Sequence, residues 1–84
     1  MEKITLNFET PEMVRSIFGR REKNIDLLSE VFGVKAVARD NFIRLIGSSD
    51  GISRARSVIR DLARIAKEGK PVTSDEYRRI VSTA

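Results

Sequence analysis

The sequence contains neither cysteine nor histidine. The chain can therefore form no disulfide, thiolate nucleophile, imidazole base or Cys/His zinc site. It also lacks a Walker-type Gly-x-x-x-x-Gly-Lys-Ser/Thr loop for ATP. Carboxylates such as Glu22 and Asp26 share a predicted helix face, but such pairs are typical of solvated surface. These absences predict no enzymatic activity, no metal site and no cofactor within this chain.

Long apolar runs are missing as well. No stretch approaches the ~20 apolar residues of a membrane span, and the first residues lack a signal-peptide pattern. We therefore expect a cytoplasmic protein with no membrane partner. A length of 84 residues, with 40% apolar and 33% charged residues, is typical of one small globular domain with a modest core.

Positive charge is in excess, with a formal net charge of +4 and a pI near 10.0. Eleven of the 16 basic residues are arginine. Guanidinium groups bind phosphate in bidentate fashion and stack on bases, so this balance suits a polyanionic partner. The same charge is also common in small domains for solubility alone, and both interpretations stay open.

Hydrophobic periodicity, helix caps and turn residues divide the chain into strands and helices. Strands are predicted at 3–8, 34–39 and 42–46, and helices at 11–18, 22–32 and 50–68, with a short last helix after residue 73. The fold class is therefore α+β. The order β-α-α-β-β-α is that of a type I KH domain, in which helices cover a three-stranded antiparallel sheet. We assign 1–69 to this KH-like domain and 70–84 to a linker and short C-terminal helix.

Local signals mark where these elements begin and end. Thr10 and Pro11 open the first helix, Gly33 ends the second, and a serine before Asp50 caps the long third helix. Thr73 forms a predicted capping box with Glu76 at the last helix.

Apolar positions predict the core. On the second helix the expected buried stripe contains Ile25, Leu28, Val31 and Phe32. The four phenylalanines all lie in apolar patterns and are expected in the core, whereas Tyr77 is left undecided.

A short basic segment lies between the first two predicted helices. Gly19 frees the chain to turn, and Arg20, Arg21 and Lys23 place three cations beside it. A KH domain carries its backbone-clamping Gly-x-x-Gly loop at this junction. This chain has Glu22 in place of the second glycine, and a carboxylate there repels phosphate.

The clamp hypothesis comes with a groove for bases. Ile17, Ile25, Val37 and Ala38 are expected to form its apolar floor. Arg39 or Lys35 is expected to contact a base edge. Such grooves typically hold about four nucleotides of single-stranded RNA.

A structural alternative concerns Glu22 and Asn24. Both residue types favour the first turn of a helix, where they satisfy free backbone amides. We therefore weigh capping of the second helix as their main role against nucleic-acid binding.

Several segments resemble the PhoH-like family of bacterial cytoplasmic P-loop ATPases. The similar elements are Gly19-x-x-Glu22-x-Asn24-Ile25, Gly33-Val34, Arg39-Asp40-Asn41-Phe42, Ile46-Gly47, residues 69–72 and the helix start at Asp75. This chain departs from the family at Glu22, where Asp is usual, and at Asp40, where the turn has Gly. Aspartate tolerates a left-handed turn position, so the hairpin is expected to survive.

The resemblance implies a role as the leading KH-like domain of such an ATPase, a family associated with phosphate starvation and RNA metabolism. ATP and Mg would then belong to an ATPase domain absent from this chain, and that domain would be a partner in cis. The expected partner of this chain is single-stranded RNA. The alternative is a degenerate KH fold that serves as a protein-interaction domain or forms a homo-oligomer.

The long helix carries a row of cations, formed by Arg56, Arg60, Arg64 and Lys67. A solvated helix face is the ordinary interpretation of such a row. The functional alternative is a second basic surface that docks the ATPase domain, another subunit or structured RNA. In a KH topology this surface faces away from the groove.

Overall fold

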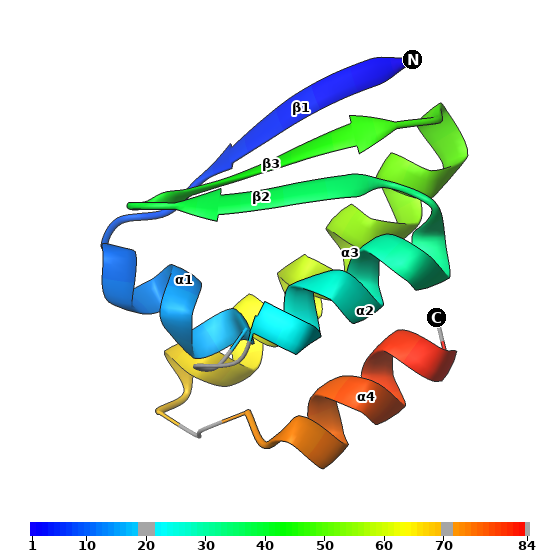
Figure 1. Ribbon diagram of the computed structural model, residues 1–84. Coiled ribbons are helices and arrows are strands. Elements are labelled where there is room, and N and C mark those ends of the chain that lie inside the picture. The colour runs from blue at the N-terminus through cyan, green and yellow to red at the C-terminus, as the bar shows by residue number, and fades with distance from the viewer. Residues whose placement is uncertain (19–21, 70–71, 84) are drawn as a thin grey trace.

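The computed structural model of the protein describes residues 1–18, 22–69 and 72–83. Within these residues three strands form one sheet, and four helices lie on a single side of it (Figure 1). In chain order the elements are β1 (Glu2–Asn7), α1 (Pro11–Phe18), α2 (Glu22–Phe32), β2 (Lys35–Arg39), β3 (Phe42–Gly47), α3 (Ser49–Lys67) and α4 (Ser74–Thr83). This confirms the predicted α+β, KH type I-like order with one additional helix.

The sheet has the order β1-β3-β2, and both pairings are antiparallel. On the central strand, Ile43 and Leu45 are fully buried against the helices. Their neighbours Phe42, Arg44 and Ile46 alternate with them and are half-buried on the opposite face. The helices therefore cover only one face of the sheet, and the other face is open.

The core lies between the sheet and the helices. It is apolar throughout the described residues, which include no buried polar or charged residue. Two predictions about it are wrong. Val31 is 46% exposed, since α2 turns that position outward, and Phe42 lies on the open face of the sheet because it alternates with Ile43. No helix in the described part of the chain is long and apolar enough to cross a membrane.

The ends of α2 and α3 meet closely. Gly33 has a φ of +63° directly after α2, and the Val34 amide donates to the Ser29 carbonyl at 3.2 Å, which closes the helix end as predicted. The Ser48 hydroxyl accepts from the Gly51 amide at 3.1 Å and caps α3. A Cβ on Gly51 would lie 2.5 Å from the Phe32 carbonyl oxygen, so only glycine allows this approach.

The turn between β2 and β3 is held against the end of β1. Asp40 has a φ of +47°, a conformation that aspartate tolerates, and the hairpin forms as expected. The Asn41 side chain donates to the Phe8 carbonyl at 3.0 Å, and the Phe8 amide donates to the Asn41 carbonyl at 2.8 Å. These two bonds fix the turn beside the start of α1.

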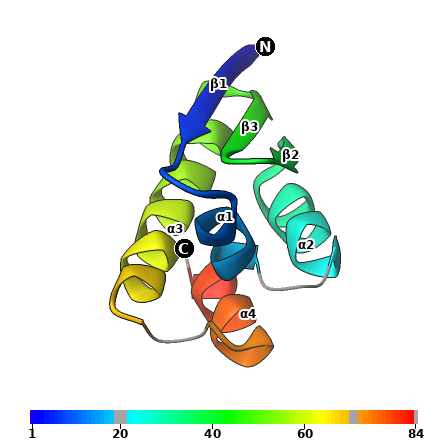
Figure 2. The same ribbon diagram turned by 90° about the vertical axis from the view of Figure 1, so that its left-hand side faces the viewer.

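The last helix packs into the same core. Helix α4 lies on the side of α1 and α2 that faces away from the sheet (Figures 1 and 2). Thr73 caps it by accepting from the Glu76 amide at 3.1 Å. Tyr77 and Val81 are 1% and 0% exposed, which settles the undecided tyrosine as a core residue.

Candidate nucleic-acid interface

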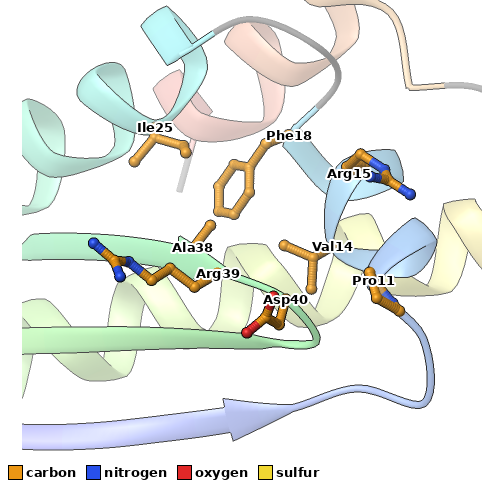
Figure 3. Close-up of a pocket in the computed structure, with 8 residues that line it drawn as sticks. All are labelled: Pro11, Val14, Arg15, Phe18, Ile25, Ala38, Arg39 and Asp40. Atoms are coloured by element: carbon orange, nitrogen blue, oxygen red, sulfur yellow. The ribbon is translucent and has the colours of Figure 1, made fainter.

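A pocket of about 280 Å³ opens between α1, the first turn of α2 and the end of β2. Figure 3 shows side chains from these elements converging on it. We call it the groove, and it is lined by Pro11, Val14, Arg15, Phe18, Ile25, Ala38, Arg39 and Asp40. It lies where the sequence predicts a base-binding groove.

Helix α1 supplies one wall of the groove. Its lining residues Pro11, Val14, Arg15 and Phe18 follow the i, i+3, i+4, i+7 spacing of one helix face. Val14 and Phe18 are almost fully buried, so only a small part of each side chain reaches the surface of the groove. The edge of the Phe18 ring contacts Tyr77, at 6.2 Å between ring centroids, which holds this wall in place.

The end of β2 supplies the opposite wall. Ala38 belongs to the inward face of the strand and packs beside Ile25 of α2 as part of the floor. Arg39 and Asp40 follow it at the exposed rim. The groove therefore has an aliphatic floor and polar groups where it opens to solvent.

The rims of the groove differ in charge. On the α1 side the Arg15 guanidinium is paired with Glu12 at 3.0 Å, but the pair is exposed and worth little. On the β2 side Arg39 can donate hydrogen bonds, whereas the Asp40 carboxylate can accept them. Among the described residues, no group of three acidic side chains could hold a metal ion.

The predicted clamp is only partly visible. Gly19, Arg20 and Arg21 lie outside the described residues. Lys23 lies in the first turn of α2. Phe18 and Ile25 flank this segment and both line the groove, so the chain enters and leaves the predicted clamp beside it.

Asn24 has a different role from the predicted cap of α2. It lies inside that helix, and its side-chain amide donates to the Phe18 carbonyl at 2.6 Å. The Asn24 carbonyl in turn accepts a hydrogen bond from the Tyr77 hydroxyl. Asn24 therefore closes the end of α1 and links it to α2 and α4.

Three other predicted groove residues lie elsewhere. Lys35 and Val37 belong to the open face of the sheet, because they alternate along β2 with the inward-facing Ala36 and Ala38. Ile17 is fully buried in the core. Of the two strand cations that we expected at a base edge, only Arg39 lines the groove.

The basic row on α3 lies away from the groove, as predicted. Arg56 and Arg60 line a second pocket, of about 290 Å³, formed by α3 and the β1 strand. Arg64 is paired with Asp61 at 3.4 Å, and Lys67 is exposed in the last turn. Leu6, Phe8, Ile59 and Ala63 give this second pocket its apolar lining.

Sequence reasoning missed Pro11, Val14, Arg15, Phe18 and Asp40 as groove residues. Pro11 was explained by the helix start, Asp40 by the turn, and the apolar pair by the core. The available signal was Arg15, a lone cation at helical spacing within the face of Val14 and Phe18. What faces that side of α1 depends on the position of β2, which spacing within one helix does not show.

No protein-family model and no curated protein sequence matches this chain. Solved structures do. Dim2p from Pyrococcus horikoshii OT3 superimposes with a TM-score of 0.74 at 17% identity, over 99% of this chain and 49% of that one. A chain of the a/eIF2alpha–aDim2p–rRNA complex from the same organism superimposes with a TM-score of 0.74 at 19% identity, over 98% of this chain and 45% of that one. This chain thus spans about half of each, and at these identities the likeness shows the fold, which is KH type I-like.

Proposed function

We propose that this chain binds single-stranded RNA in the groove between α1, α2 and β2. The observation that carries the proposal is the groove itself, with its aliphatic floor and an arginine on each rim. A groove of this kind holds bases on its floor while cations contact the backbone. A chain of the same fold in a complex that contains rRNA adds support for RNA as the ligand.

The charges suggest how a strand would lie. The Asp40 carboxylate on the β2 rim repels phosphate, so the backbone would follow the α1 and α2 side. There Arg15 and the positive end of the α2 dipole favour phosphate, and the Gly19-Arg20-Arg21 segment with Lys23 would complete the clamp. Base edges would then meet Arg39 as donor and Asp40 as acceptor.

The test is fluorescence anisotropy of a labelled RNA of about four nucleotides, the length that a KH groove holds. The double variant Arg15→Gln, Arg39→Gln removes one cation from each rim. The control Arg54→Gln, Arg79→Gln makes the same change in net charge at exposed positions of α3 and α4 that do not line the groove. Two lost phosphate contacts should reduce the slope of log K against log salt by about 1.4.

Equal affinity for both double variants would overturn the groove as the binding site. The variant Arg20→Glu, Arg21→Glu tests the clamp separately. We expect it to abolish binding at moderate salt, because each substitution replaces attraction for phosphate with repulsion.

The sequence resemblance to PhoH-like proteins supports a wider context. In that context this chain has no catalytic activity of its own and presents RNA to an ATPase domain in cis, which holds ATP and Mg. A comparison of ATP hydrolysis by the joined polypeptide with and without RNA tests this coupling.

A second candidate function is assembly, favoured by the second pocket, where Arg56 and Arg60 stand over an apolar lining. This surface would dock the ATPase domain or a second copy of the chain. Sedimentation equilibrium of the chain and of its Arg56→Gln, Arg60→Gln variant tests it. Self-association that the variant abolishes, together with no RNA affinity, would favour assembly over the RNA proposal.

A further inference from the structure

The open face of the sheet has an unusual composition. Its outward side chains form three cross-strand rows: Lys3, Ile46 and Lys35; Thr5, Arg44 and Val37; and Asn7, Phe42 and Arg39. The rows contain four cations and, in this described part of the chain, no carboxylate. This face therefore carries positive charge that no residue on it balances.

Apolar and cationic groups are arranged in order across this face. Phe42 and Ile46 lie on the central strand, and Val37 lies beside them on β2. Lys3 and Lys35 flank Ile46 on the two edge strands, roughly 10 Å apart, since neighbouring strands are about 4.8 Å apart. The face thus has an apolar centre with exposed ammonium groups at its edges.

Arg44 lies at the middle of the face in an incomplete set of contacts. Its guanidinium carbon is 5.4 Å from the centroid of the Phe42 ring. Its Nε is buried and finds no hydrogen-bond partner among the described residues. The side chain is therefore held over the ring while part of its donor capacity is unused. An aromatic ring and a guanidinium plane are the two groups on which unpaired bases stack in proteins.

Arg39 connects this face with the groove. It belongs to the outward row of Phe42, yet it also lines the groove, because β2 is an edge strand and its side chain lies at the rim. A strand that leaves the groove past Arg39 meets Phe42 and Arg44 next. The two surfaces are therefore continuous.

We propose that the open face of the sheet is a second contact surface for the same single-stranded RNA, with bases over Phe42 and Arg44 and phosphates at Lys3 and Lys35. The inference rests on the proposed RNA-binding function. A second copy of this chain is a poor occupant, because two such faces would oppose cations with no carboxylate between them. An open sheet that carries an aromatic residue is an established platform for unpaired bases.

The test compares RNA of about four nucleotides, which fills only the groove, with RNA of about twelve, within the range of single-strand binding sites. The variant Lys3→Gln, Lys35→Gln removes two exposed cations from the face. We expect unchanged affinity for the short RNA and, for the long RNA, a salt slope smaller by about 1.4. The control is again Arg54→Gln, Arg79→Gln, which should leave the difference between long and short RNA unchanged.

A second variant, Phe42→Leu, keeps an apolar side chain but removes the ring. We expect it to weaken binding of the long RNA about tenfold or more and to leave the short RNA unaffected, since base stacking contributes roughly 1–3 kcal/mol per base. Circular dichroism confirms that each variant is folded.

Equal binding of long RNA by the face variants and the control would overturn the inference. Self-association of the wild type that Lys3→Gln, Lys35→Gln alters would also overturn it and would assign the face to protein contact. Failure of the groove proposal is distinguishable, because the Arg15 and Arg39 variant would then leave the short RNA unaffected while the face variants still weaken the long RNA.

Discussion

Asn24 and Tyr77 together hold the region around the predicted clamp. The Asn24 side chain donates to the Phe18 carbonyl, which joins the two ends of the segment between α1 and α2. The Tyr77 hydroxyl donates to the Asn24 carbonyl, and its ring contacts Phe18. Tyr77 is also the sole tyrosine of the chain, so its ionisation can be followed without interference from another.

Burial raises the pKa of the Tyr77 hydroxyl above its ordinary value. The folded-state pKa is then higher than that of the unfolded chain, so stability is complete below about pH 10 and is lost as pH rises further. Above that pH we expect the free energy of unfolding to fall by about 1.4 kcal/mol per pH unit from this group.

The variant Tyr77→Phe isolates this contribution. At neutral pH it should unfold with about 0.5–1.5 kcal/mol less free energy, because the hydrogen bond to Asn24 is lost. The difference between wild type and variant should shrink above about pH 10 and then reverse. Urea unfolding at several pH values measures it, and lysine ionisation affects both proteins alike. A difference that stays constant with pH would contradict the prediction.

Two helix ends approach at Gly51. This residue is in the first turn of α3, with its α-carbon close to the Phe32 carbonyl at the end of α2. Gly33 and Ser48 direct the chain into this contact from either side. The spacing between α2 and α3 is thus set by a position where a side chain does not fit.

The variant Gly51→Ala tests this contact. In an unhindered helix the change stabilises by about 1 kcal/mol, since alanine has the higher helix propensity. Here the added Cβ would lie 2.5 Å from a backbone oxygen, and we expect a net loss of about 1–3 kcal/mol. Chemical unfolding measures the sign, with the exposed Ser53→Ala on the same helix as control. A Gly51→Ala protein more stable than wild type would show that the two helices can move apart freely.

At the scale of the whole molecule, α4 and the first three helices share one core. Tyr77 and Val81 are fully buried beside residues of α1 and α2. The sequence-based boundary at residue 69 stays a prediction, but a chain that ended there would expose the apolar surface that α4 covers. Burial of one such side chain contributes about 1.5–3 kcal/mol.

A chain of residues 1–69 should therefore lose about 3–6 kcal/mol of unfolding free energy, most of what a small domain has. Thermal unfolding followed by circular dichroism should show a broad transition or none. The full-length variant Arg79→Ala, at an exposed position of α4, is the control and should unfold like wild type. A cooperative transition of 1–69 at the wild-type temperature would contradict the shared core.

The groove and the open face belong to different elements of the same sheet edge. Arg39 is the one described residue that the structure places at both. Because β2 is an edge strand, whatever binds the groove comes within reach of the outward rows of the sheet. The basic row of α3 lies beside the other edge strand, β1.

The sequence by itself determined the order of the elements and most of their ends. Thr10, Gly33, Ser48 and Thr73 act on neighbouring backbone groups, so their roles depend only on local sequence. The same holds for the Asp40 turn. These predictions are confirmed because the interactions involved span only a few residues.

Only the tertiary structure decided which side chains meet. Val37 and Phe42 look like core residues in the sequence, yet strand alternation and a helix layer on one side alone place them on the open face. Asn24 has the composition of a cap, but Phe18 and Tyr77 lie within its reach. The groove combines one face of α1 with the end of β2, residues more than twenty positions apart. Their proximity follows from packing around a shared core, which no local pattern specifies.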